Sequence, residues 1–76
     1  MNKYLWSECS IEDWPVIKTC IAKSYPDAVE KIVNKYGERF DDDSIFNMND
    51  DWETFREYMN ENYNLALSDL EDFDEL

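Results

Sequence analysis

Two short segments near the N-terminus are rich in aromatic and β-branched residues. In residues 3–9 (KYLWSEC), the aromatic side chains of Tyr4 and Trp6 occupy alternate positions, the period of two that is typical of a strand. Residues 16–23 (VIKTCIAK) are β-branched in character, and residues 10–15 (SIEDWP) between them have the composition of a turn. The pattern predicts two strands that pair as an antiparallel β-hairpin.

The residues of the predicted turn allow one alternative. The letters SIED also form a capping box, in which Ser10 would cap a helix and Asp13 would stand three residues later. Such a helix would carry Ile17 and Ile21 on one face. Pro15 would then fall at its fifth position, where the proline ring clashes with the preceding turn, so the strand is favoured.

The next segment, SYPDAVEKIVNKYG, has the period of an amphipathic helix. It begins with a second capping box, formed by Ser24 and Asp27, and Pro26 lies in the first turn, where proline costs little. Gly37 stands where a glycine that ends a helix is expected. The predicted helix has one apolar stripe, which consists of Ala28, Val29, Ile32, Val33 and Tyr36.

A strongly acidic stretch follows this helix. Residues 39–49 include three consecutive aspartates and few periodic apolar positions, which predicts a loop. Ile45, Phe46 and Met48 are its apolar residues, and we expect them to return to the core.

The segment NDDWETFREYMNENYN predicts a second amphipathic helix, with Asp50 as its N-cap and Glu53 three residues later. At about 100° per residue, four large apolar residues fall within an arc of roughly 80°. Three glutamates share the opposite arc at a spacing of four residues, so one carboxylate recurs about every 6 Å along the helix. The apolar arc consists of Trp52, Phe55, Met59 and Tyr63, and the acidic arc of Glu53, Glu57 and Glu61.

The apolar period continues beyond this segment, so a single helix over residues 51–75 is one interpretation. Three asparagines and a third capping box, SDLE at 68–71, favour a break and therefore two helices. Residues 69–76 are so acidic that a frayed tail is a further interpretation.

Taken together, these elements predict a single α+β domain over residues 1–76, with a β-hairpin followed by two or three helices. A domain of this size buries only about 60% of the surface of its unfolded chain. The residues expected in its core are Leu5, Ile17, Ile21, Val29, Ile32, Val33, Phe55, Met59 and Leu70.

The net charge of the chain and its distribution are unusual for a small domain. The chain carries 7 basic and 19 acidic residues, for a net charge of −12. Residues 1–38 hold five lysines against six acids, whereas residues 39–76 hold two arginines against thirteen acids. Nearly all of the negative excess therefore lies in the second half, which indicates a function for that half or an acidic tail.

Several kinds of chemistry are excluded by composition. The chain has no histidine and one glycine, so histidine-based nucleophilic triads and glycine-rich phosphate loops are ruled out. The acidic balance opposes direct binding to DNA or RNA. Two cysteines cannot complete a zinc site alone, and no apolar run approaches a membrane span. We expect no enzymatic activity, no cofactor, no metal and no membrane association, in a cytoplasmic protein.

Calcium is the sharpest alternative for the acidic loop. If an EF-hand loop started at Asp42, Glu53 would fall at the twelfth position, as required. However, Phe46 and Asn47 would occupy the fifth and sixth positions, where an oxygen ligand and a glycine are needed. At most a weak cation site around residues 41–43 would remain.

The acidic pattern favours a protein that presents carboxylates to a basic surface. Such an array can occupy the lysine and arginine side chains that otherwise hold phosphates. The predicted partner is a basic nucleic-acid-binding protein or complex, bound by a monomer or homodimer of this chain. The candidate contact residues are Asp41, Asp42, Asp43, Asp50, Asp51, Glu53, Glu57 and Glu61.

In its size, its charge and its lack of histidine, the chain resembles the small acidic counter-defence proteins of phages and mobile elements. These include DNA-mimicking anti-restriction and anti-CRISPR proteins. The resemblance extends over the whole chain and involves no specific motif. It implies an inhibitor that blocks the nucleic-acid site of a nuclease or CRISPR-type complex in the host cytoplasm.

Two alternatives use the same charge differently. An immunity protein would neutralise a basic toxin through acids and tyrosines on its helices. A cytosolic interaction module would carry an acidic face that is only solvated and keeps it soluble.

Overall fold

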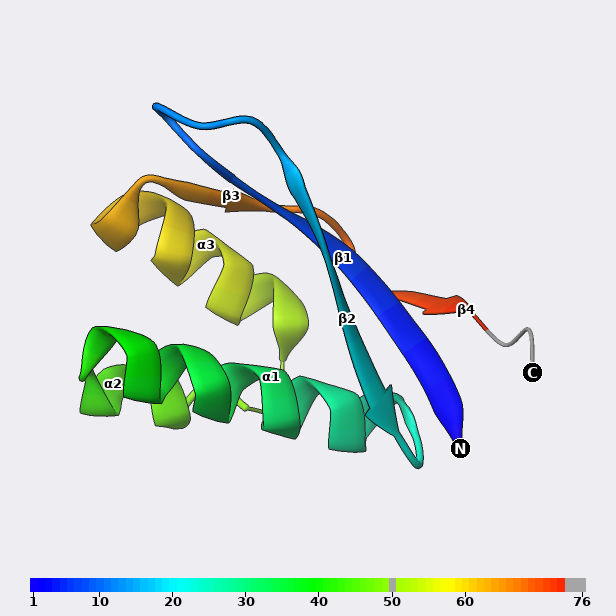
Figure 1. The fold of residues 1–76 in the computed structure, drawn as a ribbon. Helices are drawn as coiled ribbons and strands as arrows, with labels where there is room; N and C mark the ends of the chain where they lie inside the picture. Colours follow the sequence, from blue (N-terminus) through cyan, green and yellow to red (C-terminus); the bar gives the residue numbers. More distant parts are fainter. Residues whose placement is uncertain (50, 74–76) are drawn as a thin grey trace.

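The computed structural model describes residues 1–49 and 51–73. The elements follow one another as β1 (Asn2–Ser10), β2 (Val16–Ala22), α1 (Tyr25–Phe40), α2 (Asp43–Phe46), α3 (Trp52–Tyr63), β3 (Leu65–Leu67) and β4 (Glu71–Phe73). The predicted α+β class, with a hairpin followed by helices, is confirmed. Figure 1 shows that the helices lie together on one side of the sheet.

Strand β1 is the centre of an antiparallel sheet. It pairs with β2 along most of its length, from Asn2 opposite Ala22 to Glu8 opposite Val16. On its other side, β4 pairs with residues 3–5 and β3 pairs with residues 8–10. The two C-terminal strands therefore share one flank of β1, and β2 is left as an edge strand.

The helix predicted after residue 64 is wrong, because the chain forms β3 and β4 there instead. Helix α3 ends at Asn64, whose φ of 54° lies in the left-handed region that asparagine tolerates better than most residues. Leu65 and Leu67 are then buried around an exposed Ala66, which is the period of a strand. Residues 71–73, part of the segment for which fraying was considered, pair with β1 as β4.

The two faces of the sheet differ from those predicted. Tyr4 and Trp6 point toward the helices and are buried. Their neighbours along the strand point the other way, so Leu5 is only half-buried. Ile17 and Ile21 are 68% and 54% exposed, and their prediction as core residues is wrong. Both faces of the hairpin are apolar, and the face with the larger aromatic side chains is the one that the helices cover.

The core lies between the inner face of the sheet and the helices. Trp6 of β1 and Trp52 of α3 meet edge to face, with ring centroids 6.1 Å apart, a favourable arrangement for aromatic pairs. The other six residues predicted for the core are confirmed as buried: Val29, Ile32, Val33, Phe55, Met59 and Leu70.

Helix α1 continues past the glycine that was expected to end it. Gly37 lies inside the helix, and a Cβ placed there would come within 2.6–2.8 Å of the Phe46 ring of α2. The glycine therefore permits close packing of α2 on α1 rather than a turn. The helix ends instead at Asp41, whose φ is 52°. The acidic stretch predicted as a loop thus includes the short helix α2, whose residue Ile45 is buried.

Helix α3 begins one residue later than predicted. Asp51 is its N-cap, and its carboxylate accepts hydrogen bonds from the Glu53 N–H at 3.1 Å and the Thr54 hydroxyl at 2.6 Å. The predicted N-cap, Asp50, lies outside the described residues. The assignment of the cap to Asp50 is wrong, since Asp51 fills that role.

Candidate partner-binding surface

The three consecutive aspartates have three different positions. Asp41 closes α1 in the left-handed conformation and is exposed. Asp42 is half-buried and caps α2, and Asp43 lies exposed in the first turn of α2. Only Asp41 and Asp43 therefore present carboxylates freely to a partner.

Asp42 is held by two tyrosines of α3. Its Oδ2 accepts hydrogen bonds from the Tyr58 hydroxyl at 2.6 Å and the Tyr63 hydroxyl at 2.7 Å, and its Oδ1 accepts one from the Ser44 N–H at 3.0 Å. The hydrogen bonds from Tyr58 and Tyr63 hold the pKa of Asp42 below its usual value. The same contact raises the pKa of Tyr63 to about 12. Asp42 therefore connects α2 to α3, and its carboxylate is already hydrogen-bonded within the protein rather than free to bind a partner.

The predicted acidic row on α3, which consists of Glu53, Glu57 and Glu61, is exposed along its length. The opposite side of the same helix is anchored by Trp52, Phe55 and Met59, all buried. Successive glutamates are one helical repeat apart, roughly 6 Å along the axis. This is the arrangement that the sequence periodicity predicted, on a helix whose orientation is fixed by the core.

Within residues 1–49 and 51–73, the ion pairs leave the acidic row without a cation. Three pairs are present, and their acidic members are Asp27, Glu8 and Asp69. Arg56 is the one basic residue on α3, and it reaches Asp69 at 2.6 Å. The carboxylates of the row are therefore available to an external cation.

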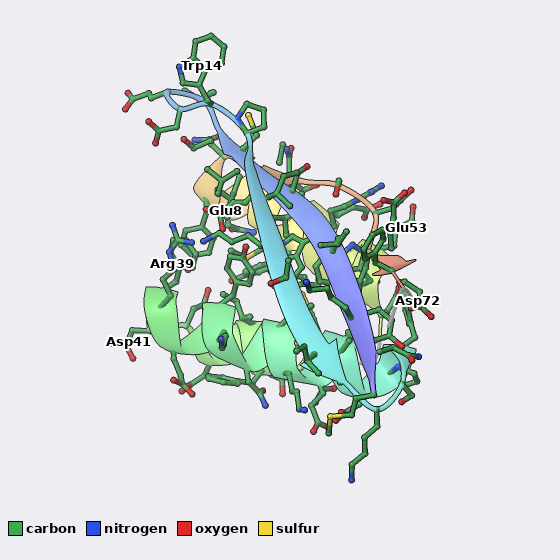
Figure 2. All side chains as sticks on the ribbon, turned by 45° about the vertical axis from the view of Figure 1, so that its right-hand side comes forward. Glu8, Trp14, Arg39, Asp41, Glu53 and Asp72 are labelled. Atoms are coloured by element: carbon green, nitrogen blue, oxygen red, sulfur yellow. The ribbon has the colours of Figure 1, made fainter. Side chains whose placement is uncertain are left out.

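Two of the candidate contact residues lie far from each other. Figure 2 shows Asp41 and Glu53 on opposite sides of the molecule. The acids of the α1–α2 corner and the start of the acidic row therefore do not form one compact patch.

The acidic row continues instead toward the C-terminal strands. The Trp52 indole N–H donates to the Ser68 carbonyl at 3.0 Å, which holds the start of α3 against the segment before β4. Asp69, Glu71 and Asp72 are all exposed there, and Glu53 and Asp72 lie on the same side in Figure 2. The sequence pattern did not predict where Glu71 and Asp72 lie, because their position depends on the pairing of β4 with β1.

A second carboxylate is held within a network that the sequence did not reveal. Glu8 of β1 accepts hydrogen bonds from the Tyr36 hydroxyl and from Arg39, the latter at 2.9 Å. The Trp6 indole N–H donates to the Tyr36 oxygen at 3.2 Å. Partial burial raises the pKa of Glu8, but the bonds from Tyr36 and Arg39 outweigh it and hold the pKa below its usual value. Burial and the bond to Glu8 raise the pKa of Tyr36.

Metal and membrane sites receive no support from the described part of the chain. No three acidic or cysteine side chains of those residues converge in a way that could hold a metal ion. Cys9 and Cys20 are both free thiols. None of the helices described combines the length and apolar character that crossing a membrane requires.

Comparison with known proteins identifies no relative. No family model, no curated protein and no solved structure matches this chain. The case for a function therefore rests on the surface itself.

Proposed function

We propose that this protein is an acidic inhibitor that presents carboxylates to the basic nucleic-acid-binding surface of a nuclease or CRISPR-type complex. The observation that supports the proposal is the acidic row of α3, which is exposed, has no cation from residues 1–49 or 51–73, and stands on a helix anchored by buried aromatics. A fixed array of this kind loses little conformational freedom on binding.

The spacing of the row sets how much surface such an inhibitor needs. One strand of duplex DNA carries a charge about every 3.4 Å along the axis, whereas the row carries one about every 6 Å. The row alone therefore has roughly half the charge density of one strand. Asp72 of β4 supplies a further carboxylate on the side of the molecule where Glu53 lies, whereas Glu71 is opposite Leu5 and points to the other face of the sheet.

Charge reversal of the row tests the proposal. The variant Glu53→Lys/Glu57→Lys/Glu61→Lys keeps every buried residue of α3. Its matched control is Glu12→Lys/Glu30→Lys/Glu38→Lys, which changes three exposed acids of the β1–β2 turn and α1 by the same total charge. Circular dichroism and thermal unfolding would establish that both variants are folded.

The readout is binding to the basic complex that the wild-type protein captures from the lysate of its source cell. We expect the row variant to lose at least about tenfold in affinity, because close charge pairs across an interface become repulsive. The control variant should stay within about twofold, and wild-type binding should weaken steeply with salt. A folded row variant that still binds and inhibits with wild-type affinity would show that α3 is not the contact surface.

A further inference from the structure

Most of the basic residues of this acidic protein are gathered in one place. Lys18 of β2 and Arg39 of α1 line a cavity of about 200 Å³ between these two elements. Lys35 lines it too, and also borders an adjoining hollow together with Lys31. These four residues define the cationic groove, and they are four of the seven basic residues in the chain.

The cationic groove is only partly neutralised. Arg39 pairs with Glu8 at 2.9 Å, and Lys31 pairs with Asp27 at 3.3 Å. Neither Lys18 nor Lys35 forms an ion pair with any residue that the structure describes. Glu38 also borders the adjoining hollow, so the four cations face three carboxylates, those of Glu8, Asp27 and Glu38. The groove keeps an excess of one positive charge, although the net charge of the chain is −12.

The free edge of the sheet borders this groove. Strand β2 has β1 on one side and no strand of the described chain on the other. The Ile21 carbonyl accepts a hydrogen bond from the Lys31 ammonium at 3.4 Å, so it points away from β1. Because backbone groups alternate in direction along an antiparallel strand, Ile17 and Thr19 also direct their N–H and C=O groups to the free edge.

The side chains of β2 differ between its two faces. Lys18 is opposite Trp6, and Trp6 points toward the helices, so Lys18 faces the groove. Ile17 and Ile21 are on the other face and are exposed. A strand added beside β2 would therefore meet cations on one face and apolar side chains on the other.

We propose that the β2 edge binds an extended segment of a partner protein in which acidic and apolar residues alternate. The segment adds as a strand to β2, with its carboxylates toward Lys18 and Lys35 and its apolar side chains beside Ile17 and Ile21. A second copy of this chain is a poorer occupant, since antiparallel pairing of two β2 edges would bring their lysines together. This site is separate from the start of the acidic row, because Arg39 and Glu53 lie on opposite sides of the molecule in Figure 2.

A titration of the isotope-labelled protein, followed by amide chemical shifts, tests this proposal. The probe is an acetylated, amidated heptapeptide of alternating valine and glutamate, and the control peptide has lysine in place of glutamate. We expect the acidic peptide to shift the amides of Ile17, Thr19 and Ile21 together with those of Lys18 and Lys35, and the basic peptide to leave them unchanged. The acidic row on α3 should be unaffected.

Two variants with the same net charge sharpen the test. Lys18→Glu/Lys35→Glu should weaken the acidic peptide at least about tenfold, whereas Lys3→Glu/Lys23→Glu, outside the groove, should leave its affinity within about twofold. The proposal is overturned by equal losses in both variants, by shifts confined to other elements, or by no shifts at all. Concentration-dependent shifts of the β2 amides without peptide would also overturn it, since the edge would then belong to a second copy.

Discussion

Two sides of the molecule carry charge of opposite sign. Cationic side chains gather between α1 and β2, whereas exposed carboxylates lie on α3 and β4. On the first, Lys18, Lys35 and Arg39 line one cavity, and Glu8, the acid that pairs with Arg39, is also held by Tyr36. On the second, Glu53 and Glu57 stand exposed on a helix whose one basic residue is paired elsewhere. Both sides share one core, so the fold itself keeps the two charge distributions apart.

This difference shows that net charge describes a protein like this one poorly. A chain of net charge −12 can still present a locally positive groove, because the field near a cleft is set by the groups that line it. Conversely, an aspartate within an acidic run can be fully engaged. Asp42 accepts two tyrosine hydrogen bonds, while its neighbours Asp41 and Asp43 are exposed.

The largest effect on stability is expected from a substitution in the core that the two sides share. Met59 is fully buried, whereas Ile17 on β2 is 68% exposed. We expect Met59→Ala to lower the free energy of unfolding by about 2–5 kcal/mol, and Ile17→Ala to change it by less than about 0.5 kcal/mol. Urea denaturation of both variants measures this. A loss of several kcal/mol for Ile17→Ala would mean that the outer face of the sheet is covered.

A smaller loss of stability is expected when the hydrogen bonds among Trp6, Tyr36 and Glu8 are removed. In Tyr36→Phe the Trp6 indole N–H loses its acceptor and Glu8 loses a donor, so we expect a loss of about 1–3 kcal/mol in the free energy of unfolding. Tyr25→Phe is the matched control, because the Tyr25 ring is partly exposed on the same helix. If the two variants lost the same stability, the network would contribute nothing specific.

The stability of the protein at acid pH depends on the two hydrogen-bonded carboxylates, those of Glu8 and Asp42. The pKa values of Glu8 and Asp42 are lowered in the folded state, so each adds stability that is fully present above its unfolded pKa, near 4. That stability is lost as the pH falls through the folded pKa. Asp42→Asn should therefore flatten the dependence of the urea midpoint on pH between about pH 5 and pH 3. Asp43→Asn, which changes an exposed neighbour, should leave the slope as in the wild type.

The smallest effect is expected at alkaline pH on the α3 side. The bond to Asp42 raises the pKa of Tyr63 to about 12, above the value near 10 of an unfolded tyrosine. The contribution is present below pH 10 or so and is lost as the pH rises toward 12. Tyr63→Phe should remove this part of the alkaline destabilisation, measured by urea unfolding at a series of pH values. An unchanged alkaline limb would show that Tyr63 does not hold Asp42 in solution.

The sequence predicted the elements whose signals are local. The hairpin, α1 and α3 each follow from periodicity and capping residues within their own segments. The choice of faces could not be predicted, because Tyr4 and Leu5 are both apolar and only the position of the helices decides between them. Strands β3 and β4 were missed because Ala66, Leu70 and Phe73 also fit a helical period, and only pairing with β1, some sixty residues earlier, excludes it.

In the candidate site, too, only the features that depend on local sequence could be predicted. The acidic row of Glu53, Glu57 and Glu61 was predicted because it depends on one helix alone. The role of Asp42 could not be predicted, since its partners Tyr58 and Tyr63 are 16 and 21 residues away. The cationic groove was missed for the same reason, because Lys18 and Lys35 come together only when α1 packs against β2.

Competition with nucleic acid is the decisive experiment on whether the acidic row occupies a nucleic-acid-binding surface. The basic complex captured by this protein would be titrated with duplex DNA and, separately, with RNA, and the release of the protein followed at several salt concentrations. Our account predicts that nucleic acid and salt each displace the protein and that the Glu53→Lys/Glu57→Lys/Glu61→Lys variant does not bind. A partner that holds the protein and nucleic acid at the same time would contradict the account and favour an immunity-type inhibitor that binds away from the nucleic-acid cleft.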